Sequence, residues 1–145
     1  MKEVITDLMD AYKFRKIFAV DDNKKTLELI RLFFYENYKN IDLDIYSDPL
    51  LAYKRFKKQF YIKPYDLAII DWKMPKITGE CLSVMLKDVD PNIKTVLYTG
   101  SSDDMFLKHL HVYKLDAILN KKLGTNVLNE VSRLLNVSSF EKVLV

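Results

Sequence analysis

Residues 67–71 read Leu-Ala-Ile-Ile-Asp, so that four apolar residues, two of them β-branched, end in a carboxylate. Three further short and mostly apolar runs occur at residues 17–20, 95–98 and 117–119. Such unbroken runs are typical of strands that are buried on both faces, as in a parallel sheet covered by helices. Residues 41–45, Ile-Asp-Leu-Asp-Ile, alternate instead, which predicts a half-exposed strand at the edge of that sheet.

The segments between these runs have apolar residues at helical spacing. These residues are Leu27, Ile30, Phe34 and Tyr38, then Leu82, Met85, Leu86 and Val89, and finally Val127, Val131, Leu134 and Leu135. Asp48 followed by Pro49 is a typical helix start, and residues 101–104 predict the start of a fourth helix. A strand–helix unit repeated five times predicts an α/β fold, (βα)5, with a doubly wound parallel five-stranded sheet. Residues 1–14 are expected to form a short helical extension that packs on the domain, with a dimer contact as the alternative.

The composition of the chain excludes several classes of protein. Its 145 residues suit one domain, and an apolar fraction of 49% suffices for a buried core. The net charge of +3 is too small to indicate a nucleic-acid or membrane partner. The single cysteine, Cys81, excludes a disulfide framework and is expected to pack as a small apolar residue. Because no apolar run is long enough for a membrane span or a signal peptide, we expect a soluble, cytoplasmic protein.

Polar residues follow four of the predicted strands at the point where each strand ends. They are Asp21 and Asp22, Asp71, Thr99, and Lys121. Since the carboxyl ends of parallel strands meet at one edge of the sheet, these side chains are expected to converge. Three close carboxylates repel one another unless one is protonated or a cation binds. Mg²⁺ is the expected ion because it prefers oxygen ligands, and no cluster of histidines or cysteines competes for it.

Residues 71–79, Asp-Trp-Lys-Met-Pro-Lys-Ile-Thr-Gly, resemble the phosphoacceptor motif of bacterial two-component response regulator receiver domains. In that motif an aspartate is followed by Met-Pro at the third and fourth positions and by Gly at the eighth. The acidic pair at 21–22, Thr99 followed by Gly100, and Lys121 agree with the same family, so the resemblance spans residues 15–135. It implies a flavodoxin-like fold with strand order 2-1-3-4-5.

The resemblance also implies a role for each residue at this edge of the sheet. Asp71 would be the nucleophile that accepts a phosphoryl group from a histidine kinase or a histidine phosphotransfer protein. The implied Mg²⁺ ligands are Asp22, Asp71 and the backbone carbonyl of Lys73, with Asp21 bound directly or through water. Thr99 and Lys121 would contact the phosphoryl oxygens, and phosphorylation would switch the surface at residues 102–135 for partner binding.

The expected organisation is an N-terminal extension at residues 1–14, a receiver domain at 15–136 and a tail at 137–145. The tail is too short for a DNA-binding module, so we expect a stand-alone receiver or the receiver portion of a longer protein. Its partners would be a kinase or phosphotransfer protein and a downstream target or output domain, without direct binding to nucleic acid or membrane. A homodimer is left open.

Three positions depart from the family pattern. Lys122 stands where a cis-proline is usual, and this peptide bond is expected to be trans because a non-proline cis bond costs about 3 kcal/mol. Ile118 stands where an aromatic residue often rotates, which makes that part of the switch doubtful. Lys73 lies two residues after Asp71, and we expect its side chain to cover the site and slow hydrolysis of the acyl phosphate. The basic and aromatic stretch at residues 57–65 has no functional interpretation from the sequence.

Other interpretations stay open at this point. Asp21 and Asp22 could cap the first helix, and Lys121 could be an ordinary surface lysine. At the level of function, the alternatives are an unphosphorylated pseudo-receiver that acts as a protein-interaction adaptor, and a small Mg²⁺-dependent aspartyl phosphohydrolase. The complete set of polar residues argues against the adaptor. The hydrolase would need a second acid where Lys73 stands.

Overall fold

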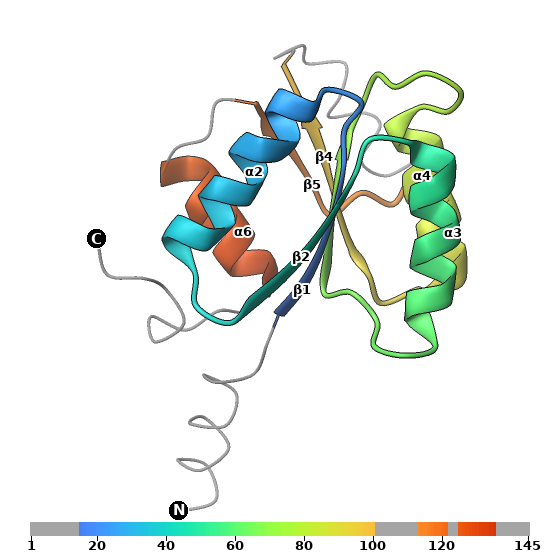
Figure 1. Ribbon diagram of the computed structural model, residues 1–145, viewed down its shortest axis with the longest axis horizontal. Helices are drawn as coiled ribbons and strands as arrows, with labels where there is room; N and C mark the ends of the chain where they lie inside the picture. Colours follow the sequence, from blue (N-terminus) through green and yellow to red (C-terminus); the bar gives the residue numbers. More distant parts are fainter. Residues whose placement is uncertain (1–14, 101–112, 122–124, 136–145) are drawn as a thin grey trace, which may run out of the picture.

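The computed structural model describes residues 15–100, 113–121 and 125–135. Within these ranges five parallel strands form one sheet, in the order β2-β1-β3-β4-β5 (Figure 1). The strands are β1 (Arg15–Val20), β2 (Ile41–Tyr46), β3 (Leu67–Asp71), β4 (Lys94–Thr99) and β5 (Ala117–Asn120). The helices in the same ranges are α2 (Lys24–Asn37), α3 (Pro49–Phe60), α4 (Gly79–Val89) and α6 (Thr125–Leu135). The predicted flavodoxin-like fold and its strand order are confirmed.

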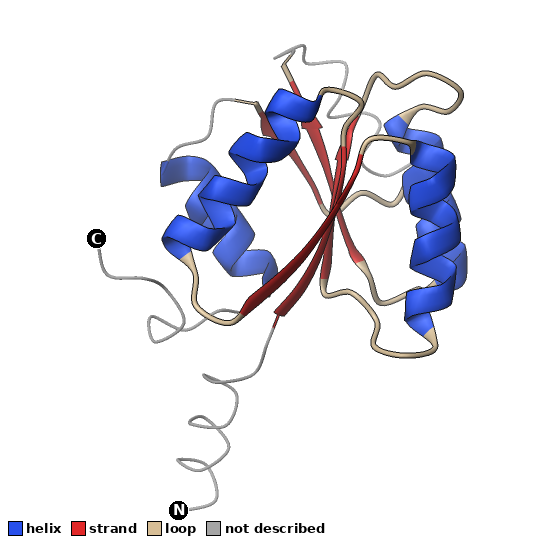
Figure 2. Cartoon of the chain, in the orientation of Figure 1, coloured by secondary structure: helices blue, strands red, loops and turns tan. Residues whose placement is uncertain are grey.

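The described part of the domain has three layers, with the sheet in the middle (Figure 2). Helices α2 and α6 cover one face of the sheet, and α3 and α4 cover the other. The described crossovers, which contain α2, α3 and α4, therefore run over a face of the sheet, as such connections require. All strands point the same way, so their carboxyl ends lie together at one edge.

Successive side chains of the central strands point to opposite faces of the sheet, so the core has two parts, one on each face. On β1, Ile17 and Ala19 pack with α2 and α6, whereas Phe18 and Val20 pack with α3 and α4. All four side chains are at most 1% exposed, because helices cover both faces of this strand. The apolar runs at the centre of the sheet follow from this double burial. The edge strand β2 is half-buried along most of its length, as its alternating sequence predicts.

Helices α3 and α4 begin where the sequence supplies a capping side chain. The Asp48 carboxylate accepts the backbone N–H of Leu50 over 2.9 Å, and Pro49 occupies the first helical position of α3. The Thr78 hydroxyl accepts the backbone N–H of Cys81 over 3.2 Å at the start of α4. These caps satisfy N–H groups that have no partner inside the helix. They fix where each helix starts relative to the strand before it.

The structure also corrects one expectation and leaves others outside the described residues. Cys81 is exposed on α4, so the prediction that it packs in the core is wrong. It lies one position before the buried Leu82, on the side of the helix that turns away from the sheet. The predicted extension at 1–14, the helix start at 101–104, Lys122 and the tail lie outside the described residues. None of the described helices has the length and hydrophobicity that crossing a membrane requires.

Candidate functional site

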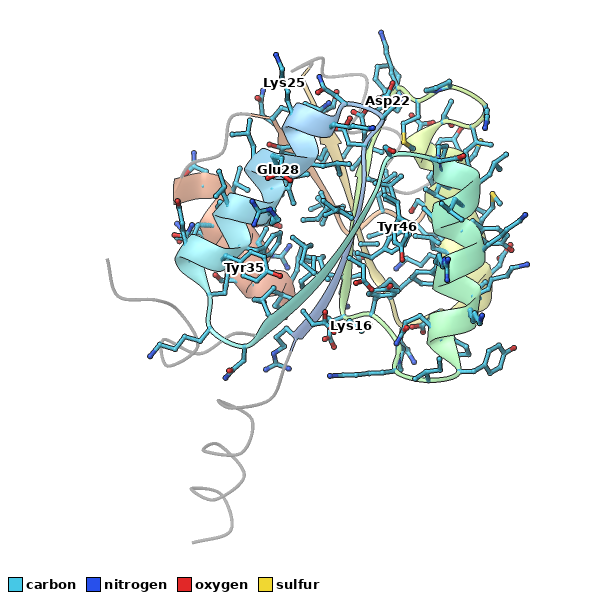
Figure 3. All side chains as sticks on the ribbon, in the orientation of Figure 1. Lys16, Asp22, Lys25, Glu28, Tyr35 and Tyr46 are labelled. Atoms are coloured by element: carbon cyan, nitrogen blue, oxygen red, sulfur yellow. The ribbon has the colours of Figure 1, made fainter. Side chains whose placement is uncertain are left out.

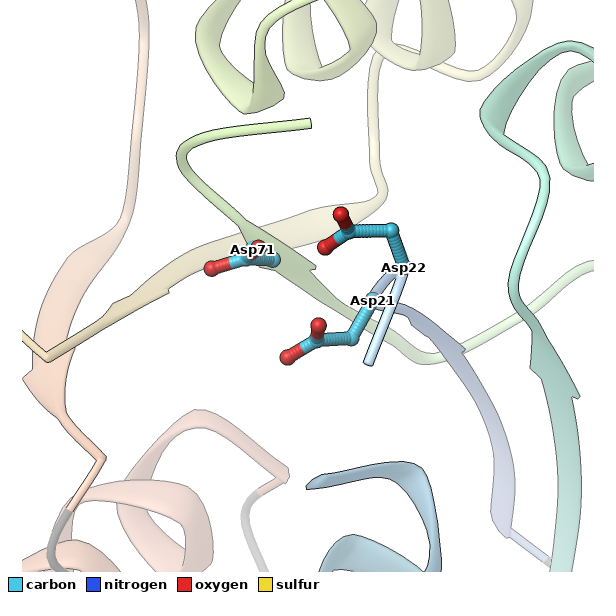
Figure 4. Close-up of side chains that lie close together, drawn as sticks. All are labelled: Asp21, Asp22 and Asp71. Atoms are coloured by element: carbon cyan, nitrogen blue, oxygen red, sulfur yellow. The ribbon is translucent and has the colours of Figure 1, made fainter. Parts of the chain in front are cut away.

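The carboxyl ends of β1 and β3 bring three aspartates together (Figure 4). Asp21 and Asp22 directly follow β1, and Asp71 is the last residue of the neighbouring strand β3. Each aspartate offers one carboxylate oxygen, and these three oxygens lie within 4.8 Å of one another. Asp21 and Asp71 are buried, whereas Asp22 is exposed. The sheet therefore creates the cluster of carboxylates that the strand ends indicated.

The turn after β1 positions Asp21. The backbone N–H of Asn23 donates to Asp21 Oδ1 over 2.8 Å. The side chain of Asn23 in turn accepts the backbone N–H of Lys25 over 2.9 Å and caps helix α2. Because Asn23 is the cap, the alternative in which Asp21 and Asp22 cap this helix is wrong. Both carboxylates are left for a different role.

Lys121 reaches the same cluster from the end of β5. Its Nζ lies 2.9 Å from Asp71 Oδ1 and 3.1 Å from Asp21 Oδ2, and its side chain is 28% exposed. Burial by itself lowers the pKa of Lys121, but hydrogen bonds and charge attraction from Asp71 and Asp21 raise it above the ordinary lysine value. The ammonium therefore stays charged and balances part of the negative charge of the cluster.

The two buried carboxyls, Asp71 and Asp21, both have raised pKa values. Burial raises the pKa of Asp71 to about 6; repulsion from Asp21 and Asp22 adds to this shift, and contact with Lys121 opposes it. Burial also raises the pKa of Asp21, against the N–H of Asn23 and the charge of Lys121. The ammonium of Lys121 is thus too little to offset the cost of burying the ionised carboxylates of Asp71 and Asp21.

The donor set of the cluster fits a hard divalent cation. All three side chains offer oxygen, the ligand atom that Mg²⁺ prefers. In addition, Asp21 Oδ2 is buried, and Lys121 Nζ, 3.1 Å away, is the cation that faces it among the described residues. A buried carboxylate oxygen that shares one ammonium with Asp71 is costly, and a bound cation would stabilise it. Asp21, Asp22 and Asp71 could therefore hold Mg²⁺.

Two hydrogen bonds join the backbone of Lys121 to β4. The backbone N–H of Lys121 donates to the carbonyl of the buried Thr99 over 2.8 Å. The hydroxyl of Tyr98 donates to the carbonyl of Lys121 over 2.9 Å, and burial raises the pKa of Tyr98 to about 12, so it stays a donor. Sequence reasoning missed Tyr98, although an aromatic residue directly before Thr99 at a buried strand end was the available signal. Thr99 and Tyr98 thus help to position Lys121 near Asp71.

The close approach of α4 to the backbone of Asp71 explains why the motif at residues 71–79 ends in glycine. A Cβ at this position would lie 2.1 Å from the backbone oxygen of Asp71, a distance that no pair of non-bonded atoms tolerates. The backbone N–H of Gly79 also donates to the carbonyl of Trp72 over 2.8 Å. The start of α4 therefore packs against the backbone of the aspartate strand, and only glycine permits that approach.

The three departures from the family pattern have different outcomes. The ammonium of the exposed Lys73 lies 5.0 Å from the centre of the Trp72 ring, and no described aspartate forms an ion pair with it. Its expected cover of the site stays a prediction, as does the role of its carbonyl. Ile118 is half-buried in β5, opposite Leu97 of β4. Lys122 lies outside the described residues.

Comparison with known families places this geometry in context. The family model of the response regulator receiver domain matches residues 17–133. The chain belongs to this family. A comparison with curated proteins finds no significant match.

Solved structures of receiver domains share the fold of the chain. A CheY-like receiver domain protein from Methanospirillum hungatei is 18% identical, with a TM-score of 0.72, and the match covers 85% of this chain and 94% of that one. The response regulator TrrA from Thermotoga maritima, in complex with Mg²⁺ and BeF, is 24% identical, with a TM-score of 0.70 and coverage of 84% and 100%. The CheX–CheY–BeF3–Mg²⁺ complex from Borrelia burgdorferi contains a chain that is 19% identical, with a TM-score of 0.73 and coverage of 83% and 88%.

Proposed function

We propose that this receiver domain accepts a phosphoryl group on Asp71 in a Mg²⁺-dependent reaction and acts as a signalling switch. The observation that carries the proposal is the site itself. Asp71 ends a buried strand, two further carboxylates lie within 4.8 Å of it, and a lysine ammonium lies 2.9 Å away. Membership of the family and the Mg²⁺–BeF complex of the Thermotoga maritima protein support the same reading.

Asp71 would act as the nucleophile. One of its carboxylate oxygens forms a bond to phosphorus while the bond between phosphorus and the donor's leaving group breaks, which gives an acyl phosphate. Such a transfer needs in-line positioning and neutralisation of the phosphoryl oxygens more than it needs proton transfer. The donor in this proposal is a phosphohistidine on a kinase or on a phosphotransfer protein.

Asp21, Asp22, Asp71 and the backbone carbonyl of Lys73 would hold the Mg²⁺ ion. When bound there, the ion would supply positive charge to a phosphoryl oxygen. Lys121 would supply a second positive charge, since its Nζ already lies 2.9 Å from Asp71 Oδ1. The Thr99 hydroxyl would donate to a further oxygen, because Thr99 ends the strand next to Asp71.

The same residues would transmit the modification. A phosphoryl group adds up to two negative charges and three acceptor oxygens at Asp71. Lys121 would move from the carboxylate to these oxygens. Because the backbone of Lys121 is hydrogen-bonded to Thr99 and Tyr98, this movement would be transmitted to β4. The surface at residues 102–135 would then bind its partner in a different state. We also propose that the protein is cytoplasmic. In this proposal the domain catalyses only its own phosphorylation and dephosphorylation.

Trp72 offers a direct test, because it follows Asp71 and is the only tryptophan of the chain. Its fluorescence is recorded while Mg²⁺ and then acetyl phosphate are added to the wild type and to the Asp71→Asn variant. We expect the wild type to respond to both additions and the variant to lack the response to acetyl phosphate. A wild type that responds to neither would favour the adaptor, and sustained turnover of phosphate esters would favour the hydrolase.

A further inference from the structure

A second charged surface lies far from the aspartate cluster. Residues 54–63, the second half of α3 and the turn after it, contain Lys54, Arg55, Lys57, Lys58 and Lys63. No aspartate or glutamate occurs between Asp48 and Asp66, whereas the whole chain has a net charge of only +3. The rest of the chain therefore carries a net negative charge, and the positive charge is concentrated in this segment, which we call the basic tip.

The basic tip also exposes apolar side chains. Tyr61 is 85% exposed and Ile62 is 74% exposed, the highest values among the large apolar side chains of the described residues. Their turn has a fixed backbone, since the N–H groups of Ile62 and Lys63 both donate to the carbonyl of Gln59, over 3.0 and 2.8 Å. An aromatic and an aliphatic side chain are thus held in solvent between cationic neighbours, where both are accessible to a partner.

A hollow of about 440 Å³ lies beside these residues, between α3 and the sheet. It is lined by Tyr46, Arg55, Lys58, Gln59, Ile62 and Tyr65. Neither Arg55 nor Lys58 forms an ion pair with a described residue. The nearest acidic groups of β2 are already engaged, because Lys16 Nζ lies 2.8 Å from Asp42 and 3.6 Å from Asp44. The hollow therefore presents two cations without a local counter-charge.

We infer that the basic tip docks on an anionic membrane surface. A lipid headgroup phosphate would enter the hollow between Arg55 and Lys58, and Tyr61 and Ile62 would enter the boundary between headgroups and acyl chains. Basic side chains beside a few apolar ones are the features by which proteins lie on a membrane without crossing it. A nucleic acid could bind the cations through its phosphates and stack its bases on Tyr61. It would, however, provide no apolar environment for Ile62. From the sequence we expected no membrane partner because the net charge of the whole chain is small. The net charge does not reveal that positive charge is concentrated in residues 54–63.

The placement of the basic tip is compatible with the proposed switch and independent of it. Helix α3 runs back along the sheet, so its last residues lie at the end of the domain opposite to the carboxyl ends of the strands (Figure 1). The aspartate cluster lies at those carboxyl ends. A domain docked through residues 54–63 would therefore leave Asp71 open to a phosphodonor.

The test is co-sedimentation of the full chain with vesicles of phosphatidylcholine alone and of phosphatidylcholine with about one-third phosphatidylserine. We expect binding only to the anionic vesicles, weakened by added salt. The double variant Arg55→Glu/Lys58→Glu and the double variant Tyr61→Ser/Ile62→Ser should each reduce the bound fraction at least about tenfold. Lys24→Glu/Lys25→Glu, an equal charge change on exposed lysines of α2, should bind like the wild type.

Each other outcome overturns the inference. Equal binding to both kinds of vesicle, or no binding to either, removes the anionic membrane as the partner. An equal loss in the α2 control shows that total charge and not the basic tip is responsible. Binding of a labelled single-stranded oligonucleotide without binding of vesicles assigns the surface to nucleic acid, and competition by inorganic phosphate alone assigns it to a free anion. Circular dichroism of every variant checks that the fold is intact, and phosphorylation of Asp71 is measured separately.

Discussion

Lys121 Nζ lies 2.9 Å from Asp71 Oδ1, so a charge from another strand end balances the proposed phosphoacceptor. Figure 3 shows the side chains of the described residues on the same ribbon. The contact is part-buried, and Asp21 shares the same ammonium at 3.1 Å. Phosphorylation would require Lys121 to exchange a carboxylate oxygen for a phosphoryl oxygen. The ion pair is therefore both a stabilising contact and the element that must rearrange.

Replacement of Lys121 by methionine keeps most of the side-chain volume and removes the charge. Loss of one partner from a buried pair costs about 3–5 kcal/mol, and the partial exposure of Lys121 reduces this, so we expect the metal-free domain to lose about 1–3 kcal/mol. Saturating Mg²⁺ should restore part of the loss, because a cation again neutralises Asp71 and Asp21. Urea unfolding with chelator and with Mg²⁺ measures both effects. The same loss of unfolding free energy with chelator and with Mg²⁺ would contradict the electrostatic account. The control is Lys25→Met, which removes a lysine charge outside the aspartate cluster.

The raised pKa of Asp71 predicts a pH-dependent stability. In the unfolded chain this carboxyl ionises near its ordinary value of about 4, but in the metal-free folded domain it ionises near 6. The folded state therefore binds the proton more tightly, and the stability due to this group falls as pH rises from about 4 through 6. Asp71→Asn removes the penalty, so at pH 7 the variant should be more stable than the wild type by about 3 kcal/mol.

This difference should be small near pH 4 and should vanish about one pH unit lower, where the wild-type carboxyl is protonated in both states. It should also shrink at pH 7 on addition of Mg²⁺, since the ion binds the ionised wild-type site. Thermal unfolding of both proteins across this pH range, with chelator and with Mg²⁺, checks the prediction. A variant that is less stable than the wild type at pH 7 in chelator would contradict it.

Gly79 should tolerate no side chain. The Cβ of alanine would lie 2.1 Å from the backbone oxygen of Asp71, so either α4 or the end of β3 must shift. Overpacking of this kind costs about 1–3 kcal/mol, and we expect Gly79→Ala to lie at the upper end and to weaken Mg²⁺ binding because it displaces Asp71. Gly100→Ala is the matched control, since its Cβ would meet Lys121 Cδ at an ordinary 4.0 Å. Equal stability of the two variants would show that the contact is absent in solution.

Tyr98→Phe tests the hydrogen bond that holds the Lys121 loop. The change removes the hydroxyl that donates to the Lys121 carbonyl over 2.9 Å and keeps the buried ring. We expect a loss of about 1 kcal/mol in unfolding free energy and slower phosphorylation by acetyl phosphate, because Lys121 is less well positioned. A variant with the full loss of stability but an unchanged phosphorylation rate would reduce Tyr98 to a purely structural role.

Much of the fold could be predicted from the sequence because its signals are local. The apolar runs of β1, β3 and β4 are buried on both faces, and the alternating residues 41–45 form part of the edge strand β2. The carboxylates that end β1 and β3 converge because parallel strands place their ends at one edge. Periodicity and strand ends contain this information without any knowledge of contacts.

What the sequence did not reveal depends on contacts between distant residues. Tyr98 reads as one more apolar strand residue until its hydroxyl is seen on the carbonyl of Lys121, 23 positions later. Asn23 competes with Asp21 and Asp22 for the helix cap, and only the geometry of the turn decides between them. Cys81 was expected to be buried because it is small and apolar, but it is exposed, because a helix that packs on a sheet buries only one side. The basic tip was visible as composition, but its exposure and its hollow required the fold.

The central claim is that Asp71 accepts phosphorus. The most direct measurement is the intact mass of the full chain after incubation with acetyl phosphate and Mg²⁺, for the wild type and for Asp71→Asn. The account predicts that the wild type gains the mass of one phosphoryl group, about 80 Da, and that chelator or the substitution prevents the gain. A wild type without added mass, or an equal gain in the Asp71→Asn variant, would contradict it.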